Sequence, residues 1–228
     1  MQDLLLLHGA IGAKDQLDGL AEALRPFYKI HTINFPGHGG EPLSKDFFSI
    51  PGFATTVRDY LQTHAISTSH IFGYSMGGYV GMYIAKNYPA EVGKLVTLAT
   101  KYYWDVEVAA KEIKMLNPAT IMQKVPAFAQ QLQKRHGTEA WVTLLDKTKE
   151  LLLGLGNDNL LQPQDYSTIS TECLLMLGDR DKMVTLEETL STYQRLMNAQ
   201  FSVLPATAHP IEQVDIDLIV FQVRRFLG

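Results

Sequence analysis

A serine flanked by glycines is the residue of this sequence with the clearest capacity for chemistry. Ser75 lies in the run Gly-Tyr-Ser-Met-Gly, residues 73–77, directly after a short apolar stretch that is typical of a buried strand. A helical pattern follows, so the sequence predicts a strand, a sharp turn and a helix. Glycines at positions 73 and 77 let the strand and the helix approach closely, and the turn exposes the hydroxyl as a nucleophile.

A serine hydroxyl needs a neighbouring base, and seven histidines are available in the chain. His209 follows the last predicted strand, so we expect it at the same edge of the sheet as Ser75. His8 and His38 belong to that edge too, but they lie in tight glycine turns. The other four lie in predicted strands or at the ends of predicted helices, where we expect structural or solvated roles: His31, His64, His70 and His136. We therefore predict that His209 is the base.

A carboxylate is needed to orient the imidazole and to stabilise its charged form. Asp179 and Asp181 both lie just after a predicted strand, with Arg180 between them. Their spacing alone does not distinguish the two.

The elements that must position these groups alternate between strand and helix. Predicted strands cover residues 4–7, 28–33, 70–72, 94–99, 172–177 and 200–204, and predicted helices cover residues 14–24, 50–64, 78–87, 185–197 and 210–226. This alternation indicates an open, mostly parallel sheet, in which the active crevice lies at the carboxyl ends of the strands. The loops that carry the candidate residues all follow strands. Residues 101–170 contain no convincing strand and are predicted to form several helices.

Composition narrows the possible partners. The 228 residues are 46% hydrophobic and 19% charged, with a net charge of -4 and no basic stripe, which argues against a nucleic-acid partner. A single cysteine, Cys173, excludes an internal disulfide. No apolar stretch is long enough to span a bilayer and the N-terminus has no signal-peptide pattern, so we expect a soluble cytoplasmic protein without a membrane partner. The oligomeric state stays open.

The order Ser75, Asp181, His209 resembles the catalytic triad of the α/β-hydrolase superfamily, and the resemblance covers essentially the whole chain. The supporting motifs are Leu-Leu-His-Gly at 6–9, Phe-Pro-Gly-His-Gly at 35–39, Gly-Tyr-Ser-Met-Gly-Gly at 73–78 and Gly-x-x-Asp-x-x-Val at 178–184. The last of these motifs, carried onto this chain, selects Asp181 over Asp179. Ala208 precedes the histidine, where the family commonly has glycine.

The resemblance also implies an architecture. It is a three-layer α/β/α sandwich with about six mostly parallel strands, without the opening antiparallel pair that is usual in the family. Residues 1–100 and 171–228 are then the hydrolase core domain, and residues 101–170 are a helical lid between the fourth and fifth strands. The implied oxyanion donors are the backbone N–H groups of Met76 and Ala10, with Ile11 as the alternative to Ala10. The implied substrate pocket draws on Ile11, Tyr74, Tyr103, Trp104, Phe128 and Trp141. No metal or cofactor is required.

The implied function is that of a serine hydrolase. It cleaves a carboxylic ester or thioester of a small, fairly apolar substrate through an acyl-serine intermediate. An alternative is a C–C bond hydrolase, or a lyase like that of menaquinone biosynthesis, that uses the same triad. A third is a hydrolase-fold binding protein without catalytic activity. The sequence does not identify the substrate.

Overall fold

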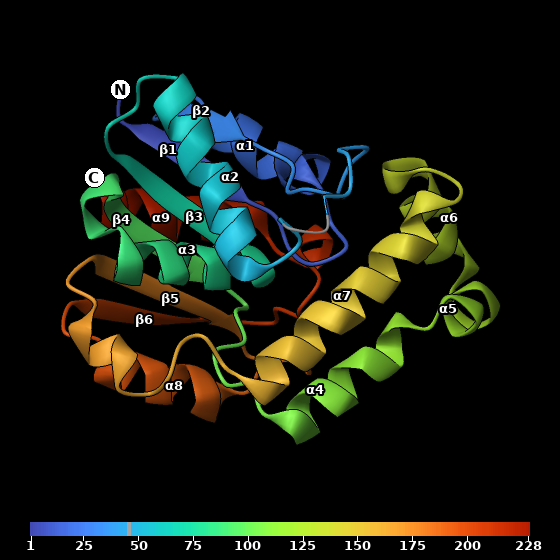
Figure 1. Cartoon of the computed structure of the whole chain (residues 1–228). Helices are drawn as coiled ribbons and strands as arrows, with labels where there is room; N and C mark the ends of the chain where they lie inside the picture. Colours follow the sequence, from blue (N-terminus) through green and yellow to red (C-terminus); the bar gives the residue numbers. More distant parts are fainter. Residues whose placement is uncertain (45–46) are drawn as a thin grey trace.

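The computed structural model describes residues 1–44 and 47–228, and its centre is one six-stranded sheet (Figure 1). The strands are β1 (Asp3–Leu7), β2 (Lys29–Thr32), β3 (Ser69–Tyr74), β4 (Val92–Leu98), β5 (Glu172–Gly178) and β6 (Ala199–Leu204). Their spatial order is β2-β1-β3-β4-β5-β6, and every pairing is parallel. The chain winds in opposite directions from β1, so the crevice of this sheet opens beyond the carboxyl ends of β1 and β3.

Helices cover both faces of the sheet, which confirms the predicted α/β/α layers. On one face lie α1 (Asp18–Leu24), which continues a 3-10 turn over Lys14–Leu17, and α9 (Ile216–Leu227); on the other lie α2 (Ile50–Thr63) and α3 (Met76–Asn87). The leucines of β1 alternate between the two layers, because successive side chains of a strand point to opposite faces. Leu4 and Leu6 join the cluster under α1 and α9, and Leu5 and Leu7 join the cluster under α2 and α3.

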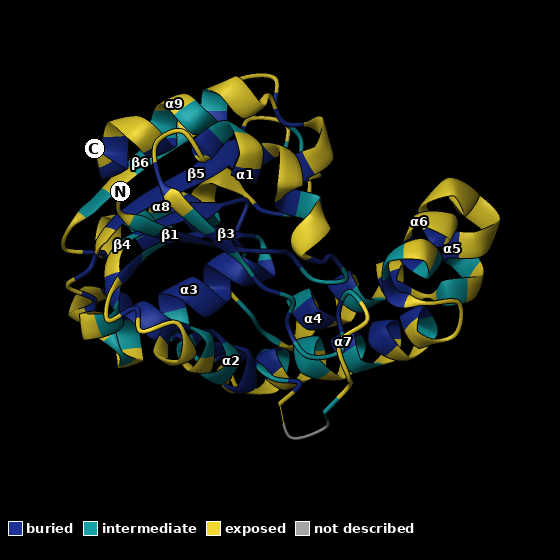
Figure 2. Ribbon diagram, turned by 90° about the horizontal axis from the view of Figure 1, so that it is seen from above, coloured by how far each residue is buried: buried dark blue, intermediate teal, exposed yellow. Residues whose placement is uncertain are grey.

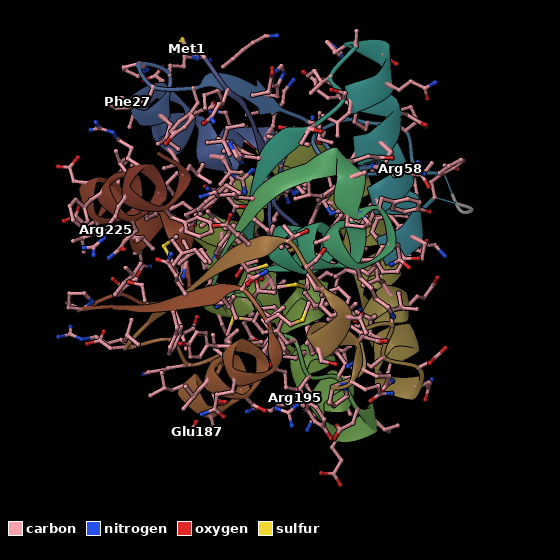
Figure 3. All side chains as sticks on the ribbon, turned by 90° about the vertical axis from the view of Figure 1, so that its left-hand side faces the viewer. Met1, Phe27, Arg58, Glu187, Arg195 and Arg225 are labelled. Atoms are coloured by element: carbon pink, nitrogen blue, oxygen red, sulfur yellow. The ribbon has the colours of Figure 1, made fainter. Side chains whose placement is uncertain are left out.

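The remaining helix of the core, α8 (Leu186–Arg195), packs beside β5 and β6. In Figure 2 most of β1, β3, β4, β5 and α3 is buried, whereas the edge strand β6 is largely accessible and α9 exposes its outer side. Labelled charged side chains at the periphery, such as Glu187, Arg195 and Arg225, point away from the sheet (Figure 3).

Between β4 and β5 the chain forms a helical insertion. It contains α4 (Val106–Glu112), a 3-10 turn η3 (Ile113–Leu116), α5 (Pro118–Lys124), α6 (Pro126–His136) and α7 (Ala140–Asn157), followed by the turn η4 (Asp165–Thr168). Helices α4 and α7 pack together, and α5 and α6 extend away from the sheet (Figures 1 and 2). The insertion has an apolar cluster of its own: Leu116, Ile121, Ala129, Leu132, Trp141 and Leu145.

The last helix begins later than the sequence predicts. Pro210 suits a first helical turn, but its ψ of 123° keeps the backbone extended, and only a 3-10 turn over Ile211–Gln213 follows. Helix α9 begins at Ile216, because the carboxylate of Asp215 caps it by accepting a hydrogen bond from Asp217 N–H. Pro210 is therefore part of the loop that carries His209.

Candidate active site

Ser75 occupies a strained turn between β3 and α3. Its φ of 52° and ψ of -116° lie outside the regions that non-glycine residues usually adopt. Hydrogen bonds hold this conformation: Ser75 N–H donates to Leu98 O at 2.8 Å, and Ser75 O accepts from Gly78 N–H at 3.0 Å and from the Thr100 hydroxyl at 3.2 Å. The surrounding structure therefore fixes a backbone that the serine alone would avoid.

The two flanking glycines are required by the close contact of strand and helix. A Cβ atom on Gly73 would lie 2.5 Å from the backbone of Gly77 and Gly78. A Cβ atom on Gly77 would collide with the carbonyl groups at the end of β1. The sequence-based reason for glycine at both positions agrees with this geometry.

Two backbone N–H groups lie beside Ser75. Met76 is the first residue of α3, so its N–H has no acceptor within the helix and lies at the positive end of the helix dipole. Ala10 follows β1 in a tight turn closed by a 3.1 Å hydrogen bond from Gly12 N–H to Gly9 O. Neither Met76 N–H nor Ala10 N–H donates a hydrogen bond within the described part of the chain, so both are available to an oxyanion.

His209 and Asp181 form a hydrogen-bonded pair. His209 Nδ1 lies 2.8 Å from Asp181 Oδ2, and the aspartate side chain is only 1% exposed. Asp181 Oδ1 accepts the N–H groups of Met183 and Val184 at 2.8 and 2.9 Å. Burial raises the pKa of Asp181, but the hydrogen bonds from His209 and from these two amides outweigh it, and the net pKa is lowered. An ionised carboxylate only accepts, so Nδ1 carries the proton and Nε2 of the neutral ring is left without one.

Asp179 has different hydrogen-bond partners from Asp181. Its Oδ1 accepts Thr207 N–H at 3.1 Å, and its side chain does not reach His209. Tyr74 contacts the loop that carries Thr207 and His209, because its hydroxyl donates to His209 O at 3.0 Å. Asp179 and Tyr74 thus hold the backbone of the loop that carries the His209 imidazole.

Ser75 lies where two cavities meet, and His209 and Ala10 line both of them. The smaller cavity has a volume of about 80 Å³, and its apolar wall includes Leu151 and Leu155 of α7. The larger one has a volume of about 240 Å³ and extends under α6. No hydrogen bond joins the Ser75 hydroxyl to His209 within the described part of the chain, and such bonds often tighten only when substrate binds.

The predicted pocket residues separate into two groups. Four line the cavities at Ser75: Trp104 in the smaller, and Ile11, Tyr74 and Phe128 in the larger. Tyr103 and Trp141 do not, which corrects the prediction. Tyr103 is 52% exposed and lines a neighbouring cavity of about 540 Å³, which shares Lys101, Glu112 and Met183 with the smaller cavity. Trp141 is buried in the apolar cluster of the insertion. Aromatic composition alone does not show which face of a helix meets the core.

Sequence reasoning missed an ion pair in the cavity wall. Lys101 Nζ lies 3.5 Å from Glu112 Oε1 and 3.7 Å from Glu188 Oε2, and it donates to Met183 O at 2.7 Å. Glu112 is 6% exposed and lines both cavities. A lysine and a glutamate eleven positions apart, on a loop and a helix, give no local signal of their contact.

Three histidines lie buried behind the Ala10 turn. The ring of His8 is 5.0 Å from that of His38, which is 6.1 Å from that of His136. His8 is completely buried, and its Nε2 accepts Phe35 N–H at 3.1 Å. Burial lowers the pKa of all three imidazoles, that of His8 to about 4. All three rings are therefore neutral near neutral pH. The sequence places His136 at a helix end, in a structural or solvated role, and does not indicate its burial.

Residues 1–44 and 47–228 contain no group of three or more histidine, cysteine, aspartate or glutamate side chains that could hold a metal ion. None of their helices combines the length and the apolar character needed to cross a membrane.

Known proteins are similar to this chain in sequence. The sequence model of the family described as alpha/beta hydrolase fold matches residues 4–170. A pimeloyl-[acyl-carrier protein] methyl ester esterase of Aeromonas hydrophila is 32% identical over 99 residues, which are 43% of this chain and only 37% of that protein. An enzyme of the same name from Vibrio campbellii is 23% identical over 248 aligned positions, which cover 98% of this chain and 94% of that protein.

Among solved structures, MenH from S. aureus has the same fold. The TM-score is 0.80 at 20% sequence identity, and the match covers 99% of this chain and 93% of MenH.

Proposed function

The chain belongs to the α/β-hydrolase fold family, and we propose that it is a serine hydrolase that cleaves carboxylic esters through an acyl-Ser75 intermediate. The observation that carries this proposal is the His209–Asp181 hydrogen bond of 2.8 Å, on an imidazole that shares two cavities with a strained serine. The esterase names of the Aeromonas and Vibrio relatives support an ester as the substrate class.

In the proposed reaction His209 Nε2 takes the proton of Ser75 while Oγ attacks the ester carbonyl carbon. The N–H groups of Met76 and Ala10 hold the oxyanion of the tetrahedral intermediate. His209 then gives its proton to the leaving alkoxide, and the C–O bond breaks to leave an acyl-serine. Water then reacts in the same way. His209 takes a proton from water, and the hydroxide adds to the acyl carbon. The bond from this carbon to Ser75 Oγ breaks, and His209 returns the proton to Ser75. Asp181 stabilises the imidazolium in both halves.

The two cavities suggest where the two arms of an ester substrate bind. The smaller cavity, of about 80 Å³ with an apolar wall, suits a short aliphatic arm. The larger one, of about 240 Å³, suits a longer arm, and its rim carries the polar side chains Gln16, Arg135 and Glu212. We therefore expect an ester with one short and one longer arm.

The insertion is part of this proposal as a lid. Residues 101–170 supply Trp104, Phe128 and the leucines of α7 to the cavity walls, whereas residues 1–100 and 171–228 supply the candidate catalytic groups. This division supports a core domain in two segments with a lid between them.

The test is turnover of p-nitrophenyl acetate, butyrate and octanoate, together with labelling by a fluorophosphonate. Wild type should hydrolyse at least one ester and take up one label, and Ser75→Ala should do neither. Ser67→Ala is the matched control, because Ser67 is exposed in the loop before β3. An acyl group found on Ser75 by mass spectrometry during turnover supports the covalent route. Turnover without it indicates that the triad activates water directly instead of forming an acyl-serine, and no turnover or label contradicts the proposal.

A further inference from the structure

The side chain of His136 joins the insertion to two loops of the core. It lies at the end of α6 and is only 4% exposed. Its Nδ1 accepts Gly39 N–H at 3.0 Å, so the proton of a neutral ring is on Nε2, which donates to Ile11 O at 2.9 Å. Both ring nitrogens are therefore used, one for each loop.

The loop that receives the Nε2–H bond is the one that carries Ala10. Ile11, the next residue, has a φ of 51°, which is unfavourable for a β-branched side chain. Such a conformation persists only where the surroundings hold it. The hydrogen bond from His136 holds the carbonyl of Ile11, two peptide units beyond the N–H that we assign to the oxyanion.

Charged and titratable groups surround this histidine. Arg135, its neighbour on α6, pairs with Asp15 of the turn after β1 at 3.0 Å, and His38 and His8 lie behind it. Burial lowers the pKa of His136, the hydrogen bond to Ile11 O acts against this, and Arg135 lowers it further. The ring is therefore neutral near neutral pH and keeps the acceptor that Gly39 N–H needs.

We propose that His136 is a positioning residue: through Ile11 it holds Ala10 N–H in the orientation that binds the oxyanion, so the Ala10 turn is ordered only while α6 is docked. This inference rests on the proposed function for its catalytic consequence. It predicts that the lid contributes to the chemical step as well as to substrate binding.

The test compares His136→Ala and His136→Gln with wild type. A glutamine amide can donate and accept as the imidazole does, so His136→Gln should keep kcat within about threefold of wild type. His136→Ala should lower kcat about tenfold to a hundredfold with KM nearly unchanged, because misplacing an oxyanion donor affects the transition state more than the bound substrate. His64→Ala is the control, since His64 is an exposed histidine at the end of α2.

Amide hydrogen exchange of a peptide that spans residues 9–12 gives a second readout that needs no activity. Exchange should be faster in His136→Ala than in wild type and normal in His136→Gln. A rise in KM with unchanged kcat, or unchanged exchange in His136→Ala, overturns the inference and leaves His136 as a lid anchor only. If the alanine protein does not fold, His136→Asn, which is too short to reach both loops, should show the same losses, and normal values there also overturn it. A wild type that hydrolyses no ester contradicts the proposed function, and the exchange result still decides the positioning role.

Discussion

His209 Nδ1 lies 2.8 Å from Oδ2 of Asp181, a carboxylate that is almost completely buried and accepts two backbone amides with its other oxygen. Replacing Asp181 by Asn should therefore lower kcat about 10³- to 10⁴-fold, because an amide in this place favours the wrong tautomer of the imidazole. Steady-state kinetics on the best p-nitrophenyl ester measures the loss.

Asp179→Asn is the matched control for this substitution. It weakens the 3.1 Å hydrogen bond to Thr207 N–H and leaves the imidazole with its partner, so we expect a loss of less than about tenfold. Equal losses in the two variants would contradict the assignment of Asp181.

Stability should fall with acid because of His8. Its pKa is about 4 in the folded protein and 6.5 as the ordinary value, so the unfolded chain binds more protons between these two pH values. The stabilisation is complete above pH 6.5 and is lost as pH falls toward 4, with a total of about 3 kcal/mol. Denaturant unfolding across this range measures it. His8→Gln should be less stable at pH 7 and show a shallower pH dependence, whereas His64→Gln should keep the wild-type slope.

The close contact beside Ser75 predicts opposite effects of the same substitution at two glycines. Gly73→Ala places a Cβ atom 2.5 Å from the backbone of Gly77 and should lower the free energy of unfolding by about 1–3 kcal/mol or more. Gly154→Ala, on the exposed side of α7 with nothing within 4 Å, should raise it by about 0.5–1 kcal/mol. Urea unfolding of both variants checks the pair. Equal destabilisation would show that the contact at Gly73 is not the cause.

The wall of the smaller cavity should set the length of the short arm. Leu155→Ala removes buried atoms from this wall and enlarges the smaller cavity. For p-nitrophenyl esters with an acyl chain longer than acetate, kcat/KM should therefore rise about tenfold relative to that for the acetate. Leu153 is 40% exposed on the same helix, so Leu153→Ala is the control and should leave this ratio of kcat/KM values unchanged. A series of p-nitrophenyl esters from acetate to octanoate gives the ratio for each variant.

Much of this arrangement could be predicted because it depends on local patterns. The apolar runs that end at Leu7 and Leu177, and the glycines around Ser75, indicate strands and turns that share one edge of a parallel sheet. Chain order and the position of His209 after the last strand then suffice to gather the candidate groups.

The rest depends on contacts between segments that are distant in sequence. Trp141 and Phe128 look alike as aromatic residues of the insertion, but only the packing of its helices buries one and turns the other to a cavity. His136 shows the same limit, because its partners Ile11 and Gly39 are about a hundred positions away and no spacing rule connects them.

The positions of the strands along the chain also determine when the candidate site can form during translation. Ser75 and Ala10 belong to the first half of the chain, whereas Asp181 and His209 follow β5 and β6, which are translated only after the whole insertion. A ribosome-bound chain that has reached α7 contains Ser75 but not His209. Hydrolytic activity should therefore be absent throughout synthesis and arise only when the last two strands join the sheet.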